Sequence, residues 1–158
     1  MSETTLSQSK SPIVLPPDCQ TVTLGVAFFD LSRMAKWTNT NEDALVASFL
    51  QKLYQLAADG LEPAGGRIVK FIGDAGLVVC PEESVETLIF ALCDLSGAAR
   101  RCGREFGIDT HLNISMHVGP VIAGSFGPKG DERFDVIGKT VNIAARLGRQ
   151  GVTLSTQA

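Results

Sequence analysis

Residues 134–147, with the sequence FDVIGKTVNIAARL, carry the most informative pattern in the chain. The apolar start, the glycine at position 138 and the following run predict a strand, a tight turn and a helix. On that helix Asn142 and Arg146 lie four residues apart and share one face, and Asp135 precedes the turn. A carboxylate, an amide and a guanidinium on one such unit could together bind a nucleotide. The alternative at this point is a solvated helix face after an ordinary turn.

The composition is that of one ordinary globular domain. The chain has 158 residues, of which 44% are hydrophobic and 20% charged, enough to bury a substantial core. The formal net charge of −3 provides no basic surface for duplex DNA or RNA, so we expect no nucleic-acid partner. No apolar run approaches the ~20 residues that span a bilayer, and we expect no signal peptide. We therefore expect a cytoplasmic protein without membrane insertion.

The cysteines and histidines are not spaced as a metal site. The four cysteines form no CxxC pair, and reduced, structural or incidental thiols are the expected state in the cytosol. The two histidines, His111 and His117, fall in a strand-like segment and are interpreted as structural. We do not expect zinc.

The order of elements predicts an α+β domain. Residues 1–20 are rich in Ser, Thr and Pro and are predicted to form a flexible tail, which leaves residues 21–158 as the folded domain. Apolar runs and glycine punctuation predict a βαββαβ order with additions, typical of an antiparallel-containing sheet with helices on one side. Leu45 and Phe49 begin the apolar face of the first helix. The expected elements are strands 22–29, 67–72, 77–80 and 151–155, helices 40–58 and 82–106, and a hairpin of 112–118 with 121–126 around Gly119-Pro120.

Two aspartates occupy similar places on the predicted sheet. Asp30 ends an apolar strand, and Asp74 lies at the tip of the hairpin turn at residues 73–76. Carboxylates at strand ends can converge on a hard cation such as Mg²⁺, and a metal pair can support an in-line displacement. The structural alternatives are an N-cap acid and an ordinary turn aspartate. Lys70 precedes Asp74 by four residues, and the sequence leaves open whether it faces solvent or a polar site.

Four blocks in this order resemble the catalytic domain of class III nucleotidyl cyclases, the adenylyl and guanylyl cyclases. The resemblance runs from about residue 22 to residue 147 and depends on the spacing of all the blocks, since each alone is common. It implies a ferredoxin-like α+β fold and a wreath-shaped homodimer in which two copies pair head to tail. The blocks are residues 28–31 (FFDL), 66–74 (GRIVKFIGD), 117–124 (HVGPVIAG) and 134–147.

The resemblance also implies roles for the polar positions. Asp30 and Asp74 match the two metal-binding aspartates, with two Mg²⁺ or Mn²⁺ ions per site. Lys70 and Asp135 match the purine-recognition pair of adenylyl cyclases, where guanylyl cyclases usually carry Glu and Cys. In the family the metal aspartates come from one subunit, and the groups that contact the base and the reacting phosphate come from its partner.

Asn142 and Arg146 match the pair that orients the ribose and stabilises the reacting phosphate. The resemblance therefore implies an adenylyl cyclase that converts ATP to 3′,5′-cyclic AMP and pyrophosphate by attack of the ribose 3′-oxygen on the α-phosphate. Lys70 only donates and ionised Asp135 only accepts, which complements adenine and mismatches guanine. The alternatives are a guanylyl cyclase and a non-catalytic cyclase-like module that binds nucleotide or a regulatory partner.

Two features depart from the family pattern. In the turn after the first metal aspartate the family has a glycine and a hydroxyl, where this chain has Arg33 and Ala35. The family's later strands supply a lysine for the triphosphate, whereas this sequence stops at Ala158. Either the domain is truncated at its C-terminus, which is what we expect, or the protein lacks this cation, and we expect weak or absent activity for the chain as it stands.

Overall fold

The computed structural model describes residues 15–147 and 152–156, which form a mixed α/β fold. The predicted tail falls mostly on residues 1–14, which lie outside the described residues. Within the described residues, no helix has both the length and the apolar composition to cross a bilayer. The elements are β1 (Gln20–Leu31), α1 (Met34–Thr40), α2 (Asp43–Leu61), β2 (Arg67–Ile72), β3 (Ala75–Cys80), the 3₁₀ helix η1 (Glu82–Ser84), α3 (Val85–Glu105), β4 (Leu112–Phe126), β5 (Arg133–Ile137), α4 (Lys139–Arg146) and β6 (Val152–Thr156).

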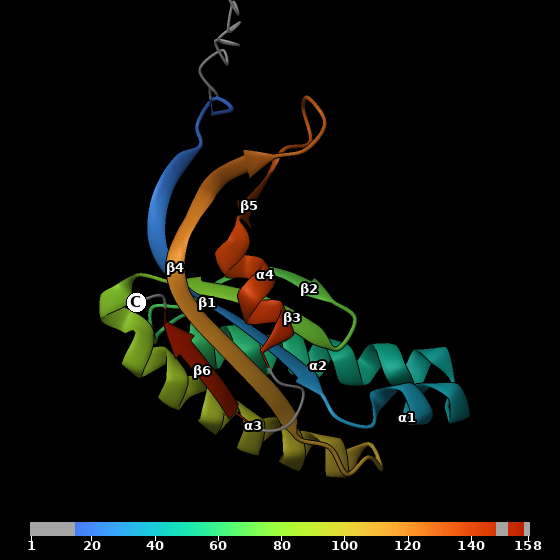
Figure 1. Cartoon of the computed structure of the whole chain (residues 1–158). Helices are drawn as coiled ribbons and strands as arrows, with labels where there is room; N and C mark the ends of the chain where they lie inside the picture. The colour runs from blue at the N-terminus through green and yellow to red at the C-terminus, as the bar shows by residue number, and fades with distance from the viewer. Residues whose placement is uncertain (1–14, 148–151, 157–158) are drawn as a thin grey trace, which may run out of the picture.

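The strands form one sheet with β1 in its middle. Their order is β2-β3-β1-β4-β5, and β6 pairs in parallel with the first half of β4. The neighbouring strands among β2, β3, β1 and β4 are antiparallel, which is the arrangement of a ferredoxin-like split βαβ unit. The predicted α+β class and βαββαβ core are confirmed. Helices α2 and α3 cover one face, as predicted, but α4 lies on the other face (Figure 1).

Two apolar layers hold the helices to the sheet. Strand β1 contributes to both, because Ala27 and Phe29 pack in the layer under α2 and α3 whereas Val26 packs in the layer that contains Ala144 of α4. Successive side chains of a strand point to opposite faces. A strand covered on both faces therefore needs a nearly continuous apolar sequence, and this is what β1 has.

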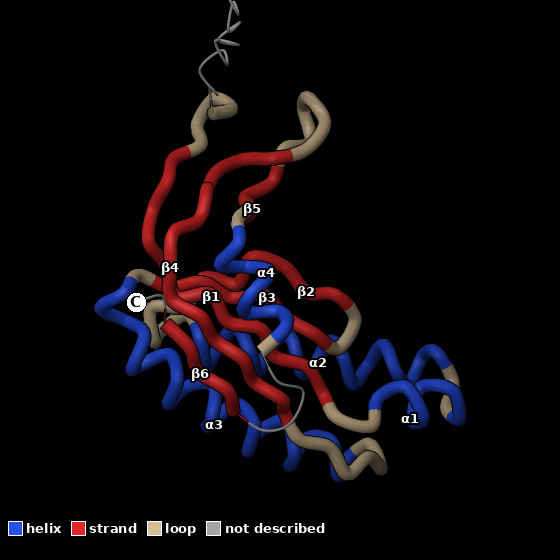
Figure 2. The backbone as a smooth tube through the Cα atoms, in the orientation of Figure 1, coloured by secondary structure: helices blue, strands red, loops and turns tan. Residues whose placement is uncertain are grey.

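Residues 112–126 form one long strand, so the predicted hairpin around Gly119-Pro120 is wrong. Both residues stay in register with β1, where Gly119 pairs with Leu24 and Pro120 with Thr23. On its other edge β4 pairs with β6 up to Val118 and with β5 only from residue 122. Proline is tolerated inside this strand because its missing N–H falls where β4 changes partners. The continuous, bent course of β4 is visible in Figure 2.

Helix α1 was not predicted from the sequence. It has only seven residues, no acid in its first turn and no side-chain cap at its start, so it carries none of the usual helix signals. Tertiary packing stabilises it instead. Met34 and Trp37 are buried, and the Trp37 ring meets Phe49 of α2 edge to face, with centroids 5.5 Å apart.

Gly76→Ala should destabilise the domain, because Phe29 occupies the space that a side chain would need. A Cβ at Gly76 would lie 2.2 Å from Phe29 Cζ, and such overpacking typically costs about 1–3 kcal/mol in the free energy of unfolding. Urea denaturation measures this loss. The control is Gly60→Ala on α2, where a Cβ would have no atom within 4 Å apart from the nearby backbone of its own helix, and a gain of up to about 1 kcal/mol is expected. Equal stability of the two variants would contradict the close β1–β3 packing.

Candidate functional site

Asp30 and Asp74 lie close together because β1 and β3 are paired. In their antiparallel register Phe29 lies opposite Gly76, which sets the end of β1 beside the β2–β3 turn. The backbone N–H of Leu31 donates to Asp74 Oδ2 at 3.1 Å. The convergence that the sequence suggests for these two aspartates is therefore present in the fold.

The Asp74 carboxyl is in an environment that disfavours its own charge. Burial raises its pKa, the neighbouring Asp30 carboxylate raises it further, and the backbone N–H of Leu31 partly opposes the change. Helix α2 contacts the β2–β3 turn, because the Tyr54 hydroxyl donates to Gly73 O at 2.5 Å. A bound cation would relieve the cost of two carboxylates at close range.

A cleft of about 370 Å³ lies beside Asp30, and Ala75, Asn113, Ser115 and Ala145 also line it. The Asn113 amide donates from Nδ2 to Asp30 Oδ1 at 2.8 Å. Two half-buried carboxylates offer hard oxygen ligands, and the described residues contain no group of three or more His, Cys, Asp or Glu side chains that could enclose a metal. This set fits Mg²⁺ or Mn²⁺, which commonly bind one or two protein carboxylates together with substrate phosphates.

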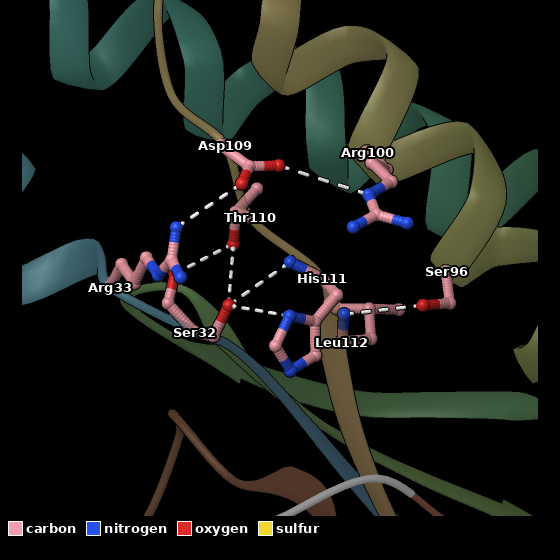
Figure 3. Close-up of polar contacts among 8 residues, drawn as sticks. All are labelled: Ser32, Arg33, Ser96, Arg100, Asp109, Thr110, His111 and Leu112. Atoms are coloured by element: carbon pink, nitrogen blue, oxygen red, sulfur yellow. Dashed lines mark hydrogen bonds and ion pairs between the residues drawn. The ribbon is translucent and has the colours of Figure 1, made fainter.

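The turn after β1 is tied to the loop between α3 and β4 (Figure 3). Ser32 Oγ accepts from the His111 backbone N–H at 3.1 Å, and the Thr110 hydroxyl donates to Ser32 O at 2.7 Å. Arg33 has a φ of 65°, the left-handed conformation that favours glycine. Its guanidinium forms an exposed ion pair with Asp109 at 3.1 Å. The turn thus keeps a glycine-like backbone at a cost of about 1–2 kcal/mol.

Lys70 and Asp135 meet although their strands are not neighbours in the sheet. Lys70 Nζ lies 2.6 Å from Asp135 Oδ2, and the guanidinium of Arg67 lies 3.4 Å from the centroid of the Phe134 ring. A bulge in β2 lets the register skip Val69, and bulges of this kind re-aim side chains. A cleft of about 350 Å³, lined in part by Val69, Lys70 and Phe134, adjoins the ion pair.

Asn142 and Arg146 lie on the outer face of α4. Both are exposed, whereas Ala144, about 200° around the helix, is fully buried. Among the described residues, no hydrogen bond or ion pair links either side chain to the other four predicted site residues. The structure of one chain therefore brings together two pairs of these residues and leaves the third pair facing outward.

Asn113 was not predicted from the sequence. Its contact with Asp30 follows from the pairing of β1 with β4, in which the two residues are direct partners. The available signal was the alternation of Asn113, Ser115 and His117 along a predicted strand, which puts three polar side chains on one face. That pattern alone does not identify the residue opposite.

The comparisons with known proteins agree with this architecture. The family model described as the adenylate and guanylate cyclase catalytic domain matches residues 17–157, so the chain belongs to this family. An uncharacterised protein of Mycobacterium tuberculosis is 30% identical over 132 residues, which cover 78% of this chain and 23% of that protein. Adenylate cyclase 2 of Rhizobium meliloti is 26% identical over 137 residues, 82% of this chain and 38% of that protein.

The crystal structure of the guanylyl cyclase Cya2 has the same fold, with a TM-score of 0.77 at 19% identity over 82% of this chain and 71% of that one. The chain spans about a quarter to two fifths of the length of the curated relatives named above. The shared region is thus one part of longer relatives.

Asp74→Asn should stabilise the metal-free protein near neutral pH and weaken its response to Mg²⁺. Because the folded-state pKa is raised above the ordinary value of 3.8, the stability linked to this group is full below that value and is lost as the pH rises through the raised one. Thermal melts should show a gain of about 0.5–1 kcal/mol and a smaller Mg²⁺-dependent shift in Tm. The control is Asp131→Asn, an exposed aspartate. A metal-free variant less stable than the wild type would contradict this electrostatic account.

Proposed function

We propose that this chain is the catalytic domain of a homodimeric adenylyl cyclase, which converts ATP to 3′,5′-cyclic AMP and pyrophosphate. The observation that carries the proposal is the 2.6 Å contact between Lys70 Nζ and Asp135 Oδ2. Relatives and structural neighbours bear the names of both adenylate and guanylyl cyclases, so family membership leaves the base open. The choice between ATP and GTP depends on the side chains that would contact the base.

Lys70 and Asp135 form a donor–acceptor pair that complements adenine. Adenine presents a ring acceptor next to an amino donor, so the ammonium of Lys70 can donate to the ring and the carboxylate of Asp135 can accept from the amino group. The backbone N–H of Val136 holds Asp135 Oδ1 at 2.8 Å, which fixes the carboxylate. Guanine presents the opposite pattern and would leave both groups unpaired, at a cost of about 1–3 kcal/mol each.

Asp30 and Asp74 would hold the two divalent cations, Mg²⁺ or Mn²⁺. Such ions, when bound, neutralise triphosphate charge and favour ionisation of the ribose 3′-hydroxyl. The two carboxylates would orient the ions and, through them, the α-phosphate that the 3′-oxygen attacks. Asn142 would align the ribose, and Arg146 would donate to the oxygens of that phosphate as charge develops on them.

Two copies would be needed for a complete site, because Asn142 and Arg146 are exposed on the outer face of α4. A second copy facing α4 would bring this pair to its own metal acids, as in the head-to-tail dimer that the resemblance implies. Ile72, Ile137 and Ile143 are large apolar side chains exposed on β2, β5 and α4. Their burial would contribute to such an interface, since exposed apolar surface commonly marks a contact between proteins.

Exchange of the base-contacting pair should reverse the nucleotide preference. The wild type is expected to use ATP about tenfold or more faster than GTP, because a mismatched base leaves buried polar groups unpaired. The double variant Lys70→Glu with Asp135→Cys, which carries the guanylyl-type side chains, should prefer GTP. Initial rates of cyclic AMP and cyclic GMP formation with Mn²⁺ measure both preferences.

Lys36→Gln is the control for this exchange, because on the exposed face of α1 it lowers the net charge by one, as the double variant does, and it should leave the preference unchanged. A wild type that prefers GTP would contradict the role of Lys70 and Asp135. Nucleotide binding without turnover of either nucleotide would favour the non-catalytic module instead.

A further inference from the structure

The two carboxylates of the site are each held at one oxygen, but by different kinds of group. Asp74 Oδ2 accepts from the main-chain N–H of Leu31, and Asp30 Oδ1 accepts from the side-chain amide of Asn113. Any residue at position 31 other than proline keeps the first donor. The second donor is present only because residue 113 is an asparagine.

We propose that Asn113 is a positioning residue for the metal site, which fixes the rotamer of Asp30 so that its second oxygen stays free for a cation. This inference rests on the proposed function, in which Asp30 is a metal ligand. It adds a residue on β4 that does not itself touch the metal or the nucleotide.

The sheet makes this contact specific. Asp30 and Asn113 are direct partners in the β1–β4 register, so their side chains project from the same face of adjacent strands. Both are half-buried and line the same cleft of about 370 Å³. An ionised carboxylate can only accept, so the amide must turn Nδ2 toward Asp30. The 2.8 Å distance is that of a charge-assisted hydrogen bond.

A neutral amide suits this task better than a charged group. Lysine or arginine at position 113 would neutralise Asp30 and compete with the cation for its charge, whereas the amide orients the carboxylate and leaves its charge available. The amide also does not titrate, so it keeps its donor at every pH. Hydrogen bonds from outside the ligand set commonly contribute tenfold to hundredfold to metal affinity.

The experiment measures Mn²⁺ binding by electron paramagnetic resonance on the full chain, without nucleotide and then with a non-reactive ATP analogue. Asn113→Leu and Asn113→Ala remove the donor with and without the side-chain volume, and Asn113→Gln retains an amide donor. Both donor-free variants should bind Mn²⁺ about 10- to 100-fold more weakly, and Asn113→Gln should recover part of the loss. Asn39→Leu, an exposed asparagine on α1, is the matched control and should bind like the wild type.

Steady-state kinetics provide a second readout that a purely structural role would not produce. The Mg²⁺ concentration for half-maximal rate should rise with the Mn²⁺ dissociation constant, while the KM for ATP at saturating metal stays within about twofold. If one donor-free variant fails to fold, the Mn²⁺ affinity of the other still tests the inference. Asn113→Leu or Asn113→Ala with wild-type Mn²⁺ affinity, while Asp30→Asn loses it, would overturn the inference and leave the proposed function intact. A wild-type chain that binds no Mn²⁺ would overturn the metal site itself.

Discussion

The antiparallel register between β1 and β3 is the constraint on which the rest of the structure depends. With Phe29 opposite Gly76, the end of β1 and the β2–β3 turn are forced together, and with them Asp30 and Asp74. Burial, and in addition the nearby Asp30 carboxylate, raises the pKa of Asp74, so the metal-free fold disfavours the charge of this carboxyl. The fold therefore holds this carboxyl at a cost in stability that a bound cation would offset, which is common at functional sites.

The bend of β4 positions the base-contacting pair, Lys70 and Asp135. Because β4 continues past Pro120 and curves, β5 comes near β2, and Lys70 reaches Asp135 across strands that are not neighbours. The same strand provides Asn113 beside Asp30. One strand thus connects the acids that would hold metal with the pair that would select the base. In the proposed dimer, Lys70, Asp135 and Asn142 of one copy would act together with the metal acids of the other.

The sequence predicted much of the fold, because apolar runs and helical repeats report burial directly. The predictions were wrong where tertiary contacts determine the local structure. The sequence around Pro120 predicts a turn, and no neighbouring residue indicates that one edge of β4 is unpaired there. On α2 the buried side chain is Val46 rather than the predicted Leu45, which is 39% exposed, because packing sets the helix rotation. The proximity of Asp30 and Asp74 could be predicted because both lie at strand ends. The contact of Asn113 with Asp30 could not, because it depends on the register between two strands, which the spacing of residues along the chain does not reveal.

In the proposed dimer each site takes its metal acids from one copy and Asn142 from the other, and a subunit-mixing assay can detect this sharing. Asp74→Ala and Asn142→Ala homodimers should each be nearly inactive. After subunit exchange at equal amounts, half of the dimers would be mixed with one intact site each, so about a quarter of wild-type cyclic AMP formation should return. Mixing Asp74→Ala with Asp30→Ala should restore nothing, since every site lacks an acid. No recovery in the first mixture, despite demonstrated exchange, would contradict the shared site.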